Sequence, residues 1–251
     1  MTLKALVQRV HLWSGLLLGI QMLFWMLSGL VMSAFPIELV RGETTAFSAP
    51  PVPLEAQTFA SPGGVIAQVD GVTSLELRRF LGRPAYLTSG QGAARALFDA
   101  ASGEKLSPLS ESLARKVAEQ DYVGQGEIVS AALVSFPPHE YRGEKPVWRI
   151  DYNDRHHTRL YISPSTGEVR ARRNDIWRLY DFFWMLHIMD YDERENTNTW
   201  QLRIFAGAGT VFTLSGMMIV FYRLRRGRYR NDLLFFAGKR RRTKNTPKQS
   251  E

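Results

Sequence analysis

The chain has 251 residues, of which 45% are apolar, and its formal net charge is +8. It contains no cysteine, which excludes disulfide bonds, thiol nucleophiles, iron–sulfur clusters and cysteine-ligated zinc. The mean hydropathy is slightly negative, as in soluble proteins, but this average combines two long apolar blocks with a polar middle of ordinary domain size.

The charge is distributed unevenly along the chain. Residues 37–198 carry 18 Lys/Arg and 22 Asp/Glu, a balance of −4, whereas residues 223–251 carry 11 Lys/Arg and two acids, a balance of +9. A basic tail can bind nucleic acid. Since basic residues that flank apolar spans stay in the cytoplasm, the pattern favours a topological role for the tail and no nucleic-acid partner.

Two uncharged runs are long enough to cross a lipid bilayer. Residues 12–35 read LWSGLLLGIQMLFWMLSGLVMSAF, and the second span, residues 199–222, contains a run of 19 uncharged residues from Ile204. The basic flanks predict that residues 1–11 and 223–251 are cytoplasmic and that residues 36–198 are periplasmic. A cleaved signal peptide is the alternative for the first run, but signal h-regions are shorter.

Small residues recur in both predicted spans. Gly15 and Gly19 form a GxxxG motif, and the Ser-Gly pair at 28–29 occurs again as Ser215-Gly216. Because small residues let helix backbones approach closely in lipid, these positions predict either a packed helix pair or a homodimer. The alternative is that glycine is simply common in membrane helices.

The predicted periplasmic part contains an internal repeat. After a linker at residues 36–62, the sequences RPAY…ALFDAASGE and KPVW…LYISPSTGE follow each other, with Gly103 and Gly167 64 positions apart. Each copy has the pattern of a helix followed by antiparallel strands joined by tight turns, so we expect two similar units at residues 63–109 and 110–173. The predicted fold class is therefore α+β.

Individual elements follow from the same patterns. The helices are expected at residues 64–69 and 110–120, the latter with Leu113 and Val117 facing the sheet, and strands at residues 75–80, 128–136 and 147–152. Trp148, Tyr152 and Tyr161 are expected near sheet edges, where a partner strand could add.

Residues 174–198 form a connector before the second span. Its first part reads NDIWRLYDFFWMLHIMDY, in which Asn174 or Asp175 can cap a helix, and an acidic stretch follows. The uncharged run within it is too short to span the bilayer. The helix is predicted either to lie at the outer membrane interface or to belong to the core of the periplasmic domain.

The order of these features resembles the PepSY-associated transmembrane family. The resemblance rests on HLWSGL at residues 11–16, the turn SPSTGEV at 163–169, the segment WMLH at 184–187 and the arrangement of two spans around two PepSY-like modules. It implies an inner-membrane protein. Larger relatives have four spans, bind haem through membrane histidines and take part in reducing imported ferric siderophores. With two spans and no flavin or nicotinamide domain, this chain is expected to be an iron-regulated accessory and not an independent reductase.

His11 and His187 are the candidate cofactor residues. Neutral imidazole is an axial ligand of haem b, and ligand-capable side chains at membrane depth are candidates for function. Trp13, Trp184 and Phe183 could line a flat apolar pocket. Since His11 starts one span at the cytoplasmic end and His187 precedes the other at the periplasmic end, about 30 Å of bilayer separates them and one haem cannot bridge both.

Each histidine therefore needs its own second ligand, from Met22, Met26 or Met185, from a second subunit or from another protein. Alternatively, His11 is an interfacial residue and His187 a hydrogen-bonded helix residue. His139 and the pair His156-His157 are expected on surface loops, and no metal site is predicted.

No catalytic motif is present in the sequence, which has no nucleophile–base set, zinc-protease motif, phosphate loop or dinucleotide fingerprint. Two functions remain open. One is an accessory of an envelope redox or iron-acquisition system, in the lipid bilayer with another membrane or periplasmic protein. The other is a tethered periplasmic module that regulates or chaperones a peptidase or another envelope partner.

Overall fold

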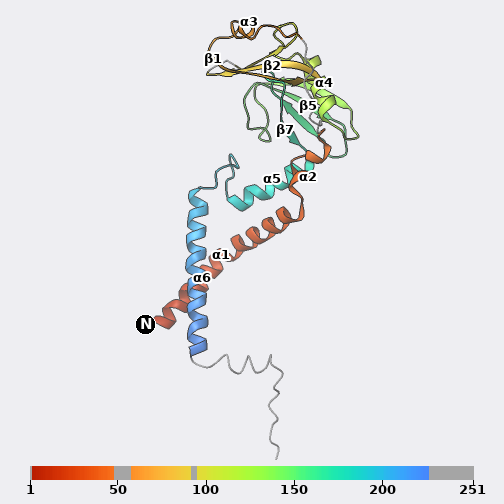
Figure 1. Cartoon of the computed structure of the whole chain (residues 1–251). Helices are drawn as coiled ribbons and strands as arrows, with labels where there is room; N and C mark the ends of the chain where they lie inside the picture. The colour runs from red at the N-terminus through yellow and green to blue at the C-terminus, as the bar shows by residue number, and fades with distance from the viewer. Residues whose placement is uncertain (1, 48–57, 92–94, 226–251) are drawn as a thin grey trace, which may run out of the picture. The chain divides into compact units, whose positions relative to one another are not determined.

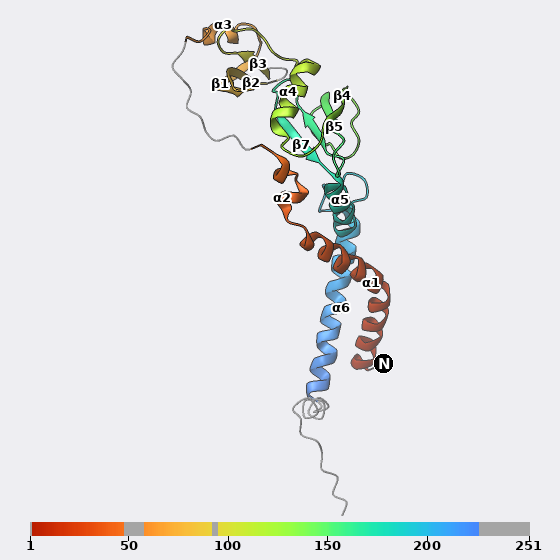
Figure 2. The ribbon, with the colours of Figure 1, turned by 90° about the vertical axis from the view of Figure 1, so that its right-hand side faces the viewer.

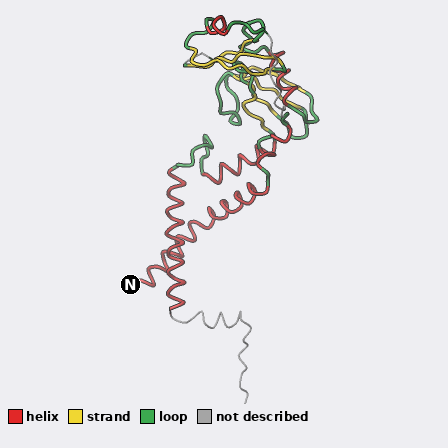
Figure 3. The backbone as a smooth tube through the Cα atoms, in the orientation of Figure 1, coloured by secondary structure: helices red, strands yellow, loops and turns green. Residues whose placement is uncertain are grey.

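The computed structural model describes residues 2–47, 58–91 and 95–225 (Figure 1). These residues form two units. The helical unit comprises residues 1–28 and 186–251, and the sheet unit comprises residues 29–185. Figure 3 shows strands only within the sheet unit, where they are drawn in yellow. The mixed α+β class is confirmed.

Two long helices dominate the helical unit. Helix α1 spans Leu3–Ala34 and helix α6 spans Trp200–Arg225. At 1.5 Å per residue, their 32 and 26 residues give lengths of about 48 and 39 Å, which exceed the hydrocarbon thickness of a bilayer. Both are long and apolar enough to cross a membrane, as predicted. Helix α1 starts nine residues before the predicted run, because Leu3–His11 contains no helix breaker.

The first sheet of the sheet unit has three antiparallel strands in the order β1-β2-β3. Its core joins Val65 of a short helix to the strand residues Tyr86 and Phe98, all buried. The elements are α3 (Pro62–Ile66), β1 (Val72–Phe80), β2 (Arg83–Gly90) and β3 (Ala96–Asp99).

The second sheet has four antiparallel strands in the order β4-β5-β6-β7, with helix α4 packed on it (Figure 2). Ser110 is the N-cap of α4, because its Oγ accepts a hydrogen bond from the Leu113 N–H over 3.4 Å. Val117 and Leu113 pack into the core, as the 3.6-residue period predicted. The elements are α4 (Glu111–Asp121), β4 (Ile128–Val134), β5 (Val147–Tyr152), β6 (Arg159–Ile162) and β7 (Val169–Arg173).

The turns that follow β3 and β6 have the same hydrogen bonds. In the first, Asp99 N–H donates to Glu104 O over 2.9 Å and Gly103 N–H donates back to Asp99 O over 2.9 Å. In the second, the residues 64 positions later, from 163 to 168, make both bonds at the same distances. Gly103 and Gly167 have φ angles of +74° and +69°, which explains the glycine in both copies of the motif.

The start of the expected linker is packed against the sheet unit. It contains α2 (Ile37–Val40) and the 3₁₀ turn η1 (Glu43–Thr45), and Val40 is buried. Phe47 N–H donates to Asp121 O over 2.6 Å, which joins this segment to the end of α4. Residues 36–47 are therefore part of the fold, against the expectation of a plain linker, and residues 48–57 lie outside the described residues.

The edge expectation for the tyrosines is wrong. Trp148 and Tyr152 lie on β5 and Tyr161 lies on β6, the two central strands of the second sheet, and both tyrosines are buried. The edge strands are β4 and β7. A strand rich in aromatic residues fits an interior position equally well, and the sequence pattern alone does not say which strands end a sheet.

Helix α5 (Asp175–Ile188) begins on the sheet unit. Asn174 is its cap, because its Oδ1 accepts a hydrogen bond from the Trp177 N–H over 2.7 Å. Arg178 and Asp181 in its first two turns form ion pairs with Glu140 and Arg142 at 2.8 and 3.1 Å. Of the two alternatives, the structure therefore supports a helix that belongs to the core of the sheet unit for this first part of α5.

Candidate functional site

His11 contacts α6 inside the helical unit. Its Nδ1 lies 2.9 Å from Ser215 Oγ and 3.2 Å from the carbonyl oxygen of Phe212. The imidazole stacks on the Phe212 ring, with 4.3 Å between ring centroids and 7° between the planes. Trp13, two positions along α1 and so about 200° around the helix, is exposed. Phe212, and not Trp13, is therefore the aromatic residue that packs on His11.

Glycine residues make room for this contact. A Cβ on Gly15 would lie 2.8 Å from Cε2 of Phe212, and a Cβ on Gly216 would lie 3.0 Å from Cε1 of His11. Around Gly19 nothing lies within 4 Å of such an atom. Of the predicted packing residues, Gly15, Ser215 and Gly216 therefore lie at the crossing of α1 and α6, whereas Gly19 does not.

His187 makes the corresponding contact at the other end of α1. Its Nδ1 lies 3.0 Å from the Oγ of Ser28, whose exposed fraction is 0%. Ser28 belongs to the Ser-Gly pair at 28–29, in the first predicted span. The two predicted histidines thus meet the two recurrent serines, one at each end of α1.

The two histidine–serine contacts lie at different levels of the helical unit. His11 and Ser28 are 17 residues apart on α1, which corresponds to about 26 Å along the helix axis. No single porphyrin can bridge them. Met185 lies two positions before His187 on α5 and so about 200° away around the helix, which removes it as a second ligand for that imidazole.

The other histidines belong to the sheet unit. His157 is 73% exposed at its side chain and pairs with Asp175 at 2.7 Å, and His156 is exposed in the same turn. Among the residues that the structure describes, no cluster of three or more His, Asp or Glu side chains could hold a metal ion.

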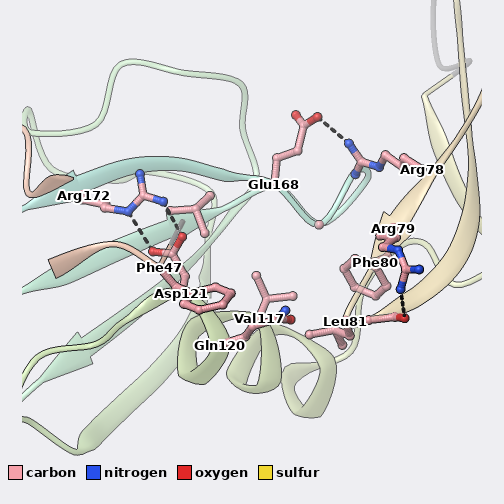
Figure 4. A pocket seen from close by; sticks show the side chains of 13 residues that line it. Phe47, Arg78, Arg79, Phe80, Leu81, Val117, Gln120, Asp121, Glu168 and Arg172 are labelled. Carbon is pink, nitrogen blue, oxygen red and sulfur yellow. Dashed lines mark hydrogen bonds and ion pairs between the residues drawn. The ribbon is translucent and has the colours of Figure 1, made fainter. Parts of the chain in front are cut away.

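The sheet unit has an open groove of about 610 Å³ between its two sheets (Figure 4). Its walls carry two ion pairs, Arg78–Glu168 at 2.7 Å and Arg172–Asp121. Phe47, Phe80, Leu81, Val117 and Val169 supply its apolar lining. The groove has the volume of a ligand pocket, but two of its three arginines, Arg78 and Arg172, are already paired with acidic partners.

A buried acid organises the loop between β4 and β5. Glu140 is 8% exposed and accepts hydrogen bonds from Arg159, Arg178 and Tyr161 at 2.9, 2.8 and 2.7 Å. Burial alone would raise the pKa of Glu140, but these three hydrogen bonds outweigh it and hold the pKa below its ordinary value. Burial raises the pKa of Tyr161, and its hydrogen bond to the Glu140 carboxylate raises it further. Sequence reasoning missed this residue, because its partners lie 19 to 38 positions away.

The β4 edge of the second sheet is apolar. Its seven residues read IVSAALV, of which Val129 and Leu133 are exposed, and Phe136 just beyond the strand is 91% exposed. The opposite edge strand, β7, reads VRARR. Since charged residues protect edge strands from pairing, β4 is the edge that can accept another strand.

Two apolar helices of spanning length, attached to an α+β unit, define a membrane protein that contacts the lipid bilayer. A comparison with protein-family models matches the PepSY-associated TM region over residues 8–247, and the chain belongs to this family. Comparisons with the curated proteins and with the solved structures gave no match.

Proposed function

We propose that this protein is a haem-binding accessory of an envelope redox or iron-acquisition system in the bacterial inner membrane. The observation that carries the proposal is the pair of histidine–serine contacts, one at each end of α1. In both contacts the serine oxygen lies beside Nδ1, so Nε2 of each imidazole is left for a ligand. A histidine that binds a metal through one ring nitrogen usually hydrogen-bonds through the other, which fixes the orientation of the ring.

The residues of the helical unit fit one imidazole ligand per site. His11 and His187 would each hold an iron through Nε2, with the second ligand from a second copy of the chain or from another membrane protein, because Met26 lies about 200° around α1 from Ser28 and Met22 about 16 Å along α1 from His11. Haem b, when bound, supplies one-electron chemistry. The chain's own part is to place the two imidazoles about 26 Å apart along α1, and the sequence contains no catalytic set that would make it an enzyme on its own.

The orientation in the membrane is part of the same proposal. The basic residues at both chain ends favour cytoplasmic termini, with residues 36–198 in the periplasm. Within that part, the matching hydrogen bonds of the turns after β3 and β6 support two tandem PepSY-like units. Each unit has a helix followed by antiparallel strands.

An absorption spectrum of the detergent-solubilised protein tests the haem proposal. The purified protein, or the protein reconstituted with haemin, should show a Soret band that His11→Ala and His187→Ala each weaken. His156→Ala, which removes an exposed imidazole of the sheet unit, is the matched control and should leave the band unchanged. A protein that binds no haemin, or binds it equally in all three variants, would reject the proposal.

The open edge of β4 favours a second function, a tethered periplasmic module that binds an extended segment of a peptidase or another envelope partner by strand addition. A photo-crosslinking residue at Val129 should then capture one discrete partner. The variant Leu133→Lys should abolish this capture because it charges the edge, whereas Arg170→Lys on the opposite edge strand β7 should not. Capture that survives Leu133→Lys would argue against strand addition.

A further inference from the structure

The hydroxyl protons of Ser28 and Ser215 are already committed within their own helices. Ser28 Oγ donates to the carbonyl of Trp25 over 3.1 Å, and Ser215 Oγ donates to the carbonyl of Phe212 over 2.7 Å. A serine hydroxyl has one proton, and a carbonyl oxygen can only accept. Each Oγ therefore has only its lone pairs left for the histidine.

This commitment decides which ring nitrogen carries the proton in both histidines. An Oγ that donates to its own helix carbonyl can only accept from the histidine, so this hydrogen-bond arrangement places a hydrogen on Nδ1 of His187 and on Nδ1 of His11. For His11 a second acceptor requires the same assignment, because the Phe212 carbonyl oxygen lies 3.2 Å from Nδ1. In a neutral imidazole the lone pair then resides on Nε2.

We infer that Ser28 and Ser215 are positioning residues that hold His187 and His11 in the Nδ1–H tautomer, with the Nε2 lone pair available to a metal. The identity of the ligand as haem iron rests on the proposed function. The tautomer does not, because it is set by the chain's own hydrogen bonds and exists before any ligand binds.

The local structure explains why a serine is suited to this role. Both serines donate to the carbonyl three residues earlier in their own helix, which fixes the side-chain rotamer and the direction of the lone pairs. Ser28 is fully buried and Ser215 is nearly so, so water does not compete for the contact. With the glycine at 216 next to Ser215, the imidazole of His11 can approach α6 closely.

Nitrogen NMR of the protein labelled with ¹⁵N-histidine, without haem, tests the tautomer. His11 and His187 should show the Nδ1–H pattern, as should His157, whose Nδ1 lies 2.7 Å from Asp175 Oδ2, and His11→Ala and His187→Ala assign the two signals of the helical unit. Ser28→Ala should remove this pattern from His187, Ser28→Thr should restore it, and Ser215→Ala should act in the same way on His11. Ser33→Ala removes the same kind of back-bond in α1, to Leu30, and should change neither histidine. Nε2–H histidines in the wild type, or no response to either serine variant, would overturn the inference.

Haemin titration separates this inference from the proposed function. Loss of a hydrogen-bond partner behind a ligating histidine weakens metal binding about 10- to 100-fold, so Ser28→Ala and Ser215→Ala should each lower haemin affinity to this extent and shift the midpoint potential. If the wild type shows the Nδ1–H pattern but binds no haemin, the proposed function fails and the tautomer assignment stands. If haemin binds and both serine variants keep wild-type affinity and potential, the positioning role is rejected.

Discussion

The ring of Phe80 packs directly on the backbone of Gly167, so that a Cβ on this glycine would overlap the ring. Phe80 ends β1 in the first sheet, and Gly167 lies in the turn between β6 and β7 of the second. The adjacent pair Arg78–Glu168 joins the same two segments at 2.7 Å. This turn therefore connects the two sheets as well as closing a hairpin.

The substitution Gly167→Ala should destabilise the sheet unit by about 2 kcal/mol or more, because a left-handed backbone costs about 1–2 kcal/mol without glycine and the new methyl group displaces Phe80. Chemical denaturation measures the loss. In the Phe80→Ala background the same substitution should cost less, since only the backbone strain remains. Equal costs in both backgrounds would show that the ring does not contribute.

Glu140→Gln should destabilise the sheet unit by about 1.5–3 kcal/mol, because it removes the charge that receives hydrogen bonds from Arg159, Arg178 and Tyr161. Glu144 in the same loop is the matched control. Its pair with Arg95 is exposed, with side-chain exposed fractions of 69% and 48%, so Glu144→Gln should cost about 0.5 kcal/mol or less. Comparable losses in the two variants would contradict the assigned role of Glu140.

The free energy of unfolding of the wild type should also decrease as the pH is lowered through the acid range. Because the pKa of Glu140 is lowered from 4.5 in the folded state, its contribution is complete above the unfolded pKa and is lost as the pH falls through the folded value. Glu140→Gln should flatten this part of the stability curve, measured by denaturant unfolding at a series of pH values. An unchanged slope would mean that other carboxylates dominate.

Gly15→Leu should weaken the packing of α1 on α6, because the new side chain meets the ring of Phe212, whereas Gly19→Leu should be tolerated by the monomer. Thermal unfolding in detergent, followed by the helical circular dichroism signal, compares the two. The double variant Gly15→Leu/Phe212→Ala should recover part of the loss. If Gly19→Leu instead dissociates an oligomer, Gly19 belongs to a homodimer interface.

The predicted topology can be tested by labelling single cysteines, because the chain has none of its own. Gln120→Cys on the exposed side of α4 should react with a membrane-impermeant maleimide from the periplasmic side. Asn245→Cys in the basic tail should react only after the membrane is permeabilised. Reaction of both positions under the same condition would contradict the assignment of residues 36–198 to the periplasm.

Local patterns predicted much of the fold. The two apolar helices, the cap at Asn174 and the glycine turns depend on residues close together in the sequence, and each was predicted from composition, spacing or backbone conformation. The order of strands in the second sheet depends on pairing between distant segments. That is why Tyr152 and Tyr161 were expected at edges and lie on central strands.

The candidate site divides in the same way. The sequence indicated His11 and His187 as ligand-capable residues, and it contained the recurrent Ser-Gly pairs, but nothing in it linked each histidine to a serine at least 159 positions away. Such a link depends on how the helices cross. The same is true of Phe212, which replaces the expected Trp13 as the ring beside His11.

The contrast between the two outer strands of the second sheet limits how this protein can assemble. A fibril grows by sheet extension only if both edge strands of every molecule can pair with another strand. Each added molecule then presents an unpaired edge strand to the next one. Here the arginines of β7 close one end, and only β4 remains receptive. Any association through this sheet therefore stops after a single addition, which protects the membrane surface from open-ended polymerisation.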